Sequence, residues 1–493
     1  MLYKSTRGKG EAVNSANAIV RGIAEDGGLF IPTSIPKINF DCNALSKMNY
    51  RELAYFVMKE FFTDFTEEEL KNCINKAYDN KFDTDEITPV NKIGNDFFLD
   101  LHHGPTLAFK DVALSILPHL LTTSVKKLGL DKEILILTAT SGDTGKAALE
   151  GFNNVDGIKI IVFYPVDGVS IVQKLQMVTH DGHNTHVVGI KGNFDDAQKA
   201  VKEIFTDEAT RKQLDAKGFM FSSANSINIG RLIPQVVYYF YAYLDLFKKG
   251  EISKDEKINV VVPTGNFGNI LAGYLAKYMG APIDKLICAS NENKVLYDFI
   301  STGTYDSNRD FFVTNSPSMD ILVSSNLERL LYFISGENCE TINALMSSLK
   351  NEGKYKVSEE MKAKLSDFYG GYATEEETCA AISEIYTDFK EIIDTHTAVA
   401  YSVYNKYKKA TKDGTKAVIL STASPFKFPK SVMEAIDKKY AGISELELIK
   451  EIKKLGNYNI PAGIKDMDLR AVVHNTVCDK TEIKKSVTDY LGI

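Results

Sequence analysis

Hydrophobic and polar positions follow a helical spacing near the N-terminus. Leu53, Val57 and Phe61 recur at intervals of four residues. Thr66 then opens a Thr-Glu-Glu-Glu run, which is typical of a helix start because the hydroxyl can cap the first free N–H groups. The pattern predicts helices between residues 50 and 78.

From about residue 97 onward, short apolar runs alternate with amphipathic segments. This alternation predicts βαβ units and open, mainly parallel sheets. The expected strands are residues 134–137, 158–163, 187–190, 219–221, 258–262, 286–289 and 417–420. The expected helices are residues 146–152, 171–179, 195–205, 227–247 and 270–279. Between about residues 293 and 394 the strand pattern stops and the pattern is helical.

These patterns predict an α/β fold with two open sheets, a helical N-terminal cap and a helical excursion in the second half. The chain has 493 residues, which is more than one hydrophobic core usually holds. We expect a cap at 1–90, a larger domain that begins at 91–130, a smaller domain at 131–225, and the rest of the larger domain at 226–493 with its helical insertion at about 293–394.

Charge and composition narrow the class of protein. The net charge of −7 provides no basic surface for nucleic acid. The apolar run at residues 236–247 is too short to cross a membrane and contains Asp245, so we expect a buried helix. Six cysteines are scattered singly, which suggests reduced thiols in a cytoplasmic protein.

Lys110 follows a Gly-Pro turn and the apolar run Leu107-Ala108-Phe109. Partial burial would disfavour its ammonium form and leave a free amine that can attack an aldehyde. A lone lysine is more often an ordinary surface residue. The case for chemistry at Lys110 therefore depends on what accompanies it.

One polar turn, residues 138–145, directly follows the expected strand 134–137. Backbone amides at the start of the next helix favour an anion. Alternatively, the hydroxyl residues only cap that helix. A P-loop is excluded, because Thr140 occupies the position of its first glycine and Ala147 that of its hydroxyl residue.

Two further turns also follow expected strands. Residues 263–269 contain two glycines that leave N–H groups free for a phosphate, although a plain tight turn would use the same residues. Residues 421–425 offer hydroxyls that could contact a ring nitrogen or merely form a turn before Pro425. Together with Lys110, the three turns contain an amine, two anion sites and a hydroxyl.

Taken in order, these segments resemble threonine synthase, a fold-type-II pyridoxal-phosphate enzyme family. The resemblance rests on residues 5–8 (STRG), 26–30 (DGGLF), 104–111 (GPTLAFKD), 140–145 (TSGDTG), 224–228 (ANSIN), 265–269 (GNFGN) and 394–399 (DTHTAV). The N-terminal cap is similar to that of the longer bacterial and fungal form. The resemblance implies a tryptophan-synthase-β-like fold, in which the larger domain binds pyridoxal 5'-phosphate and the smaller domain carries a substrate loop.

The resemblance also implies roles for individual residues. Lys110 would be the catalytic residue and form a Schiff base with pyridoxal 5'-phosphate, while Thr422 would contact the pyridine nitrogen. The cofactor phosphate would bind at Gly265, Asn266, Phe267, Gly268 and Asn269. The substrate would be bound by Thr140, Ser141, Gly142, Asp143, Thr144, Asn228 and Arg231.

Of the possible ligands for the substrate's phosphate, Arg231 is the first candidate, since arginine matches phosphate in a bidentate geometry. Arg7 and His396 come after it. The family converts O-phospho-L-homoserine and water to L-threonine and phosphate, the last step of threonine biosynthesis. This is the reaction of a carbon–oxygen lyase acting on phosphate. We expect this small-molecule substrate, no nucleic acid or membrane partner, and a monomer or homodimer.

Two departures and two alternatives remain. Ser424 stands where the longer family form usually has histidine, and Asn269 replaces a common aspartate. A threonine or serine dehydratase or a cysteine synthase relative would share the fold, but Asp143 and the long cap argue against both. A non-catalytic protein that binds phosphorylated ligands would also keep the two anion sites. For an enzyme, we expect the smaller domain to close over the substrate and exclude water.

Overall fold

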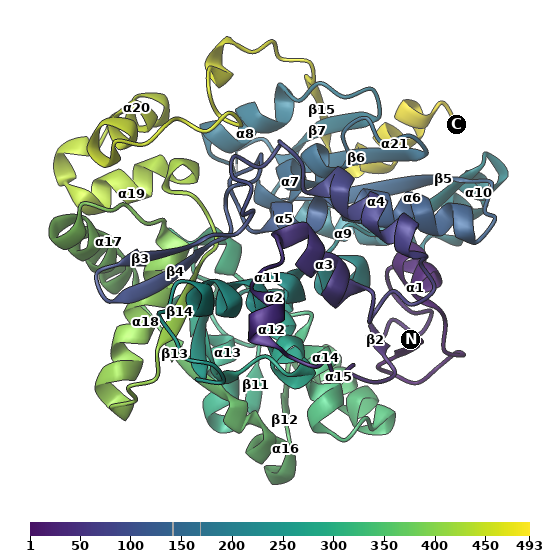
Figure 1. The fold of residues 1–493 in the computed structure, drawn as a ribbon. Coiled ribbons are helices and arrows are strands. Elements are labelled where there is room, and N and C mark those ends of the chain that lie inside the picture. The colour runs from purple at the N-terminus through teal and green to yellow at the C-terminus, as the bar shows by residue number, and fades with distance from the viewer. Residues whose placement is uncertain (141, 168) are drawn as a thin grey trace.

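The computed structural model describes residues 1–140, 142–167 and 169–493. Two open sheets dominate the fold, and they lie in different parts of the molecule (Figure 1). The five-stranded sheet, whose strands come mainly from residues 133–222, is at the upper right of that view. The six-stranded sheet is at the lower left, and the cap helices lie in front of both.

The five-stranded sheet is parallel throughout, in the order β15-β7-β6-β5-β8. Its side chains alternate between two layers, because neighbouring strand residues point to opposite faces. Ile134 and Ile136 pack with helix α7, whereas Leu135 and Leu137 pack with helices α9, α10 and α21. The strands are β5 (Glu133–Ala139), β6 (Ile158–Pro165), β7 (Thr185–Lys191), β8 (Phe219–Ser222) and β15 (Thr476–Asp479). The helices are α7 (Asp143–Phe152), α8 (Ile171–Val178), α9 (Phe194–Thr206), α10 (Glu208–Ala216) and α21 (Ile483–Leu491).

The six-stranded sheet has the order β13-β10-β9-β14-β4-β3, and only the edge strand β3 is antiparallel. Every residue of β9 is buried, which is typical of a central parallel strand covered on both faces. The strands are β3 (Val90–Ile93), β4 (Asp96–Asp100), β9 (Ile258–Pro263), β10 (Ile283–Ser290), β13 (Phe368–Tyr372) and β14 (Ala417–Ser421). Associated helices are α5 (Lys110–Leu114), α6 (Leu117–Lys127), α11 (Ile229–Lys248), α12 (Gly268–Met279), α17 (Glu375–Phe389), α18 (Thr395–Thr411), α19 (Pro429–Ile436) and α20 (Glu445–Gly456).

The N-terminal cap is mainly helical, as its pattern predicts. Thr66 caps α4, and Glu69 completes a capping box with it, so the expected helix start is confirmed. A short antiparallel pair, β1 with β2, precedes the helices. The cap elements are β1 (Tyr3–Ser5), α1 (Ser15–Arg21), β2 (Phe30–Pro32), α2 (Cys42–Leu45), α3 (Tyr50–Met58) and α4 (Glu67–Ala77).

The excursion at 293–394 is mostly helical, but the expectation that it contains no strands is wrong. Strand β13 joins the edge of the six-stranded sheet beside β10, and a small hairpin pairs β11 with β12. The glycines at 370 and 371, which interrupt a helical pattern, lie within β13. The other elements are α13 (Val295–Thr302), β11 (Thr304–Asp306), η1 (Pro317–Met319), α14 (Leu327–Ile334), α15 (Cys339–Glu352), β12 (Lys354–Lys356) and α16 (Glu359–Ala363).

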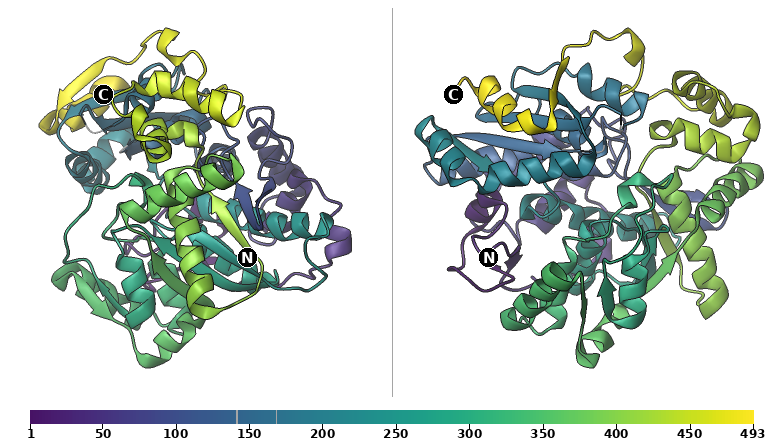
Figure 2. Two further views of the ribbon diagram at one scale, coloured as in Figure 1. Left: turned by 90° about the vertical axis from the view of Figure 1, so that its left-hand side faces the viewer. Right: turned by 180° about the vertical axis from the view of Figure 1, so that it is seen from behind.

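The end of the chain returns to the first sheet. Strand β15 pairs in parallel with β7, where Thr476 lies opposite Val188, and helix α21 packs on the same sheet. Figures 1 and 2 show this C-terminal segment beside the strands of the first half. The expectation that 226–493 belongs as a whole to the larger domain is therefore wrong. Strand β15 is short and most of its side chains are exposed, so its sequence does not indicate that it pairs with the distant strand β7.

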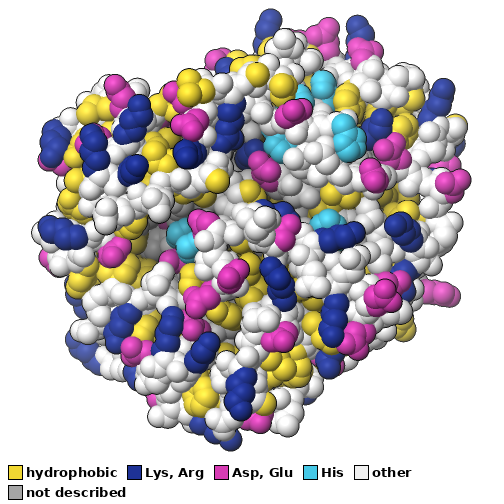
Figure 3. Space-filling view, turned by 45° about the horizontal axis from the view of Figure 1, so that its top comes forward, with side chains coloured by type: hydrophobic (Ala, Val, Ile, Leu, Met, Phe, Trp, Pro, Cys, Tyr) yellow, Lys and Arg dark blue, Asp and Glu magenta, His cyan; other side chains and the backbone are white. Residues whose placement is uncertain are grey.

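Two expectations about the surface can be compared with the structure. Residues 236–247 lie within helix α11, most of whose side chains are buried, and none of the helices in the described ranges is long and apolar enough to cross a bilayer. Lysine and arginine side chains alternate with aspartate and glutamate on the face shown in Figure 3, without a large area of one sign.

Candidate active site

Lys110 is the first residue of helix α5, at the end of a loop that runs beside the end of strand β14. Ala108 pairs with Ala423 in an isolated β-bridge, and the N–H of Phe109 donates to the carbonyl of Thr422 at 2.8 Å. The backbone therefore places Lys110 next to Thr422. Among the described residues, the Thr422 hydroxyl has no hydrogen-bond partner, so it is free to meet a ligand.

The Lys110 side chain is only 11% exposed. Its Nζ lies 3.1 Å from Oγ of Ser318 and 3.3 Å from Oδ2 of Asp143. Burial lowers the pKa of the Lys110 amine below its usual range, and the nearby charges of Lys427 and Arg231 lower it further against the opposing effect of Asp143. This shift has the direction that the sequence argument for a free amine requires.

Asp143, the first residue of α7, is the centre of the polar contacts around Lys110. Its carboxylate accepts hydrogen bonds from the Ser318 hydroxyl at 2.8 Å and from Nε2 of Gln173 at 3.0 Å. Burial by itself raises the pKa of this carboxyl, but the charges of Lys427 and Lys110 outweigh it, and the pKa lies below its usual range. Asp143 is therefore an anion in the site.

The other residues of the predicted substrate loop, 140–144, have two kinds of role. Some hold the shape of the turn, and others leave polar groups available to a ligand. Oγ1 of Thr140 accepts the N–H groups of Gly142 and Gly145, both at 2.9 Å, so it shapes the turn. Gly142 has a φ of +132°, and a Cβ there would lie 2.4 Å from the Gln173 side chain. Ser141 lies outside the described residues. Thr144 is half-buried, and its hydroxyl has no partner in the described part of the chain.

The predicted phosphate turn, residues 265–269, leads into helix α12. Phe267 has a φ of +63°, and a Cβ on Gly265 would lie 2.6 Å from the Ser318 carbonyl oxygen. The Asn266 and Gly265 carbonyls accept hydrogen bonds from Asn326 and Ser324, which hold the turn from behind. Gly268 is buried as the first residue of the helix.

Asn269, at the end of this turn, has one orphaned polar group. Its Oδ1 accepts the hydroxyls of Tyr238 and Tyr239, both at 2.7 Å, whereas the buried Nδ2 has no partner in the described structure. A buried donor at a helix N-terminus, beside a turn that admits no Cβ, fits an anionic oxygen.

Among the residues predicted to bind the substrate, Arg231 has the charge and burial best suited to an anion. The side chain is buried, and one Nη donates to the Ala224 carbonyl at 2.7 Å. Its Nε has no partner, and no carboxylate of a described residue pairs with the guanidinium. Burial lowers the pKa of Arg231 to about 10, which leaves it a cation at neutral pH. A buried, unpaired cation is costly, so this position favours an anionic ligand.

The other predicted phosphate ligands already have protein partners. Arg7 is paired with Glu328 at 2.9 Å. Nδ1 of His396 lies 2.7 Å from Asp394, and its Nε2 accepts the N–H of Ser318 at 3.2 Å. Substrate contacts by Arg7 and His396 are therefore less favoured than one by Arg231.

Asn228, which the sequence assigned to the substrate, acts as a helix cap. Its oxygen accepts the N–H of Gly230, and its Nδ2 donates to the carbonyls of Ile19 and Ser223. Because these bonds engage both ends of a fully buried amide, the side chain fixes the start of α11 and thereby the direction of Arg231. A direct substrate contact by Asn228 stays a prediction.

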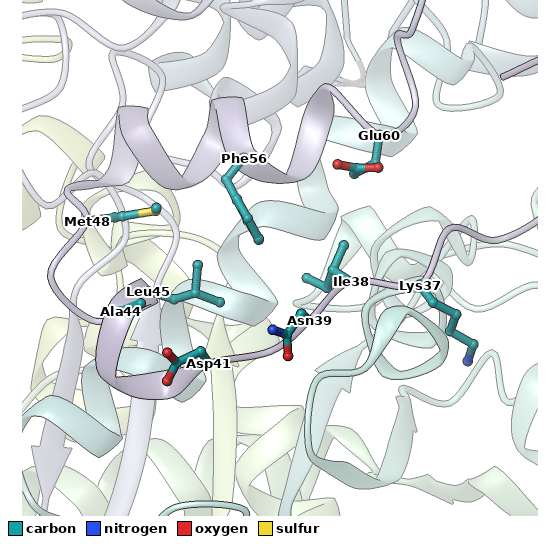
Figure 4. Close-up of a pocket in the computed structure, with 9 residues that line it drawn as sticks. All are labelled: Lys37, Ile38, Asn39, Asp41, Ala44, Leu45, Met48, Phe56 and Glu60. Carbon is teal, nitrogen blue, oxygen red and sulfur yellow. The ribbon is translucent and has the colours of Figure 1, made fainter.

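A separate pocket of about 420 Å³ lies on the cap, as Figure 4 shows. Its side chains come from α2, α3 and the segments before, between and just after these helices, and none of the predicted site residues lines it. The chemistry around Lys110 therefore lies in the buried region that Asp143 covers, and the open cap pocket is not part of it.

The comparisons with known proteins match this geometry. Residues 2–78 match the family model "Threonine synthase N terminus", residues 87–423 "Pyridoxal-phosphate dependent enzyme", and residues 397–472 "Threonine synthase, C-terminal". Threonine synthase of Pseudomonas aeruginosa is 38% identical over 439 residues, which cover 88% of this chain and 90% of that protein. The chain belongs to the threonine synthase family.

Two other relatives extend the comparison. The crystal structure of pyridoxal-phosphate-bound threonine synthase from Brucella melitensis has a TM-score of 0.88 and 35% identity, and covers 100% of this chain and 98% of its own. Human threonine synthase-like 1 is 40% identical over 457 residues, covering 90% of this chain but 60% of its own length. The threonine synthase fold therefore extends over the whole chain, and the expected α/β class is confirmed.

The residues of this family member fit the cofactor that the family binds. The turn at 265–269 would take the phosphate of pyridoxal 5'-phosphate, Lys110 would hold its aldehyde carbon, and Thr422 would meet the ring nitrogen. At the departure position, the Ser424 oxygen accepts the N–H of Phe426 at 3.4 Å and caps η3 (Pro425–Lys427). Ser424 therefore has a structural role here.

Three residues of this threonine synthase site were missed by sequence reasoning: Ser318, Gln173 and Lys427. The sequence around Ser318 and Gln173 does not mark either residue as functional, and only the fold brings them to Asp143. Lys427 did carry a signal, because it stands between Phe426 and Phe428 just after a strand end. A lysine among aromatic residues at the catalytic edge of a sheet indicates a buried, paired charge.

Proposed function

We propose that the protein converts O-phospho-L-homoserine and water to L-threonine and phosphate, with pyridoxal 5'-phosphate bound to Lys110. One observation carries the proposal: a buried guanidinium, Arg231, has no carboxylate partner among the described residues and lies close enough to lower the pKa of Lys110. The Lys110 amine thus has one anion site for the cofactor phosphate, at residues 265–269, and a second one at Arg231. The second site matches a substrate that carries its own phosphate.

The chain's residues account for the steps of this reaction. The cofactor, when bound, withdraws electrons from the substrate's Cα. Lys110, once free, is the amine within reach of the reacting carbons and moves protons at Cα, Cβ and Cγ. The Cγ–O bond breaks and Arg231 binds the departing phosphate through charge-assisted hydrogen bonds. Water adds its oxygen at Cβ, and Cγ gains a proton.

The loop at 140–144 supports binding of the substrate carboxylate. The start of helix α7 presents N–H groups with a partial positive charge, and the Thr144 hydroxyl has no partner among the residues that the structure describes. Asp143 is an unsuitable carboxylate ligand, since like charges repel. Its contacts to Ser318 and Lys427 instead hold the loop against the larger sheet.

The experiment is phosphate release from O-phospho-L-homoserine by the purified protein loaded with pyridoxal 5'-phosphate, with Lys110→Ala as the inactive control. Equal amounts of threonine and phosphate are expected, together with visible absorbance that Lys110→Ala lacks. Ammonia release from threonine or serine, without phosphate release, would instead indicate a dehydratase. A colourless wild-type protein that binds phosphate would indicate a non-catalytic binder.

Domain organisation and assembly belong to the same proposal. We infer a cap at 1–90, a larger cofactor domain that includes 91–130 and most of 226–475, and a smaller substrate domain at 131–225 joined by 476–493. The six free cysteines support a reducing, cytoplasmic location. We expect a monomer or homodimer, which sedimentation of the full chain would decide.

A further inference from the structure

Lys427 is a buried lysine that has no part in the reaction steps proposed above. It ends the short helix η3, and its side chain is 1% exposed. Its Nζ donates to the Thr106 carbonyl at 2.7 Å and lies 3.3 Å from Oδ1 of Asp143. Burying an ammonium group is unfavourable unless it is paired, so the contact with Asp143 stabilises Lys427 in this position.

Asp143 is shared by the side-chain nitrogens of two buried lysines. Its Oδ1 lies 3.3 Å from Lys427 and its Oδ2 lies 3.3 Å from Lys110. Arg231 adds a positive charge that acts on Lys110, and His396 also acts on Asp143.

A second buried carboxyl, Asp111, adjoins Lys110 in the chain; burial raises the pKa of Asp111 to about 6, and the charge of Lys427 opposes that rise. Lys427 therefore acts on two carboxyls, and Asp143 is the one that it shares with the Lys110 amine.

Lys427 also connects the three segments that build the site. It follows the strand end that carries Thr422, it bonds the carbonyl of Thr106 in the loop before Lys110, and it pairs with the substrate loop through Asp143. A side chain in this position fixes the carboxylate relative to the amine.

We propose that Lys427 is a positioning residue, which binds the Asp143 carboxylate so that Lys110 is not held as an ammonium ion and can react as a free amine. The proposal rests on the proposed role of Lys110. Without Lys427, Asp143 would have Lys110 as its principal cation. The ammonium form would then be stabilised, and the fraction of neutral amine at a given pH would fall.

The test uses the full-length, cofactor-free protein. Acetic anhydride labels neutral amines, and peptide mass spectrometry gives the extent of labelling at Lys110 as a function of pH. In Lys427→Met we expect the midpoint to rise by about one pH unit, which is about tenfold less neutral amine at a fixed pH below the midpoint. Lys427→Arg should restore most of the wild-type profile. Lys430→Met, an exposed lysine on the next helix, is the matched control and should leave the profile unchanged.

A second background shows whether Lys427 acts through Asp143. In Asp143→Asn the further change Lys427→Met should shift the Lys110 midpoint much less than it does in the wild type, because coupled residues are not additive. An unchanged midpoint in Lys427→Met with a native circular dichroism spectrum would overturn the proposal, as would equal shifts in both backgrounds.

If Lys427→Met does not fold, Lys427→Gln, which removes the charge but can keep the bond to Thr106, gives the same comparison. The result is separable from the proposed function. A wild-type protein that releases no phosphate from O-phospho-L-homoserine would contradict the proposed reaction, whereas labelling of Lys110 would still measure the effect of Lys427.

Discussion

The hydroxyl of Ser318 donates a 2.8 Å hydrogen bond to Oδ2 of Asp143 and so joins turn η1 to helix α7 of the other sheet. The same hydroxyl lies 3.1 Å from Nζ of Lys110. The Ser318 side chain therefore contacts both helix α7 of the other sheet and the Lys110 amine. We predict that closure of the smaller domain and preparation of Lys110 are coupled through this side chain.

Ser318→Ala should loosen that closure. One hydrogen bond to a charged group is worth about 1–2 kcal/mol, so the open form should become roughly fivefold or more populated. Hydrogen exchange measured by mass spectrometry should show faster exchange for residues 139–145. Ser348→Ala, which removes a hydrogen bond from remote helix α15 to the Lys354 carbonyl of β12, is the control. Identical exchange in wild type and Ser318→Ala would mean that this bond does not hold the loop.

Arg231→Met should weaken binding of phosphate much more than binding of the cofactor. Loss of a buried, charge-assisted contact costs about 3 kcal/mol, which is roughly a hundredfold in the inhibition constant of inorganic phosphate. Arg231→Lys should recover part of the loss, because it keeps the charge but not the paired N–H groups. Exposed Arg211→Met provides the control. Unaltered phosphate inhibition in Arg231→Met would assign the phosphate to other residues.

Gly265→Ala should impair cofactor binding. The added Cβ would lie 2.6 Å from the Ser318 carbonyl oxygen, which is backbone and cannot turn aside. We expect about a 5- to 30-fold rise in the dissociation constant of pyridoxal 5'-phosphate, since one displaced hydrogen bond is worth about 1–2 kcal/mol. Absorbance titration of the apoprotein measures it. Gly414→Ala, where a Cβ meets nothing within 4 Å, is the matched control, and equal affinities in the two variants would contradict the argument.

Glu150→Gln should lower stability at neutral pH but not in strong acid. Burial alone raises the pKa of Glu150, but its hydrogen bond with His180 and the charge of Lys146 lower it from 4.5 to about 2. A lowered carboxyl pKa contributes stability above the unfolded value of 4.5, and this contribution is lost as the pH falls towards 2. The shift corresponds to about 3 kcal/mol.

Melting temperatures measured by calorimetry across pH 2–7 should therefore differ most between wild type and Glu150→Gln near neutral pH and converge in acid. Glu25→Gln, at an exposed pair with Arg21, should shift the curve little. A difference that stays constant over the whole range would show that packing, and not the charge of Glu150, is responsible.

The sequence was most informative where local rules decide structure. The capping box at Thr66 and Glu69, and the buried runs of the central strands, follow from spacing and side-chain type alone. Lys110 and the turn at 265–269 could be proposed from the sequence because a reactive amine and a phosphate site need recognisable residues in short segments; their roles stay predictions.

The remainder depends on distant contacts. Ser318 is 175 positions from Asp143 along the chain, and Lys427 is further still, so no local pattern relates them. Asn228 illustrates the opposite case: it lies in a recognisable motif, and only the structure shows that the backbone around it occupies its polar atoms. Burial and pairing, which decide the charge state of a side chain, appear only once the chain is folded.

The pairing of Thr476 with Val188 has a consequence for the growing polypeptide. On the ribosome, the β7 edge of the parallel sheet emerges long before the segment that covers it, and its unpaired N–H and C=O groups stay accessible in the meantime. The half of the molecule that carries Asp143 is thus completed only after β15 has been synthesised, and until then this edge is open to chaperone contact or to misassembly.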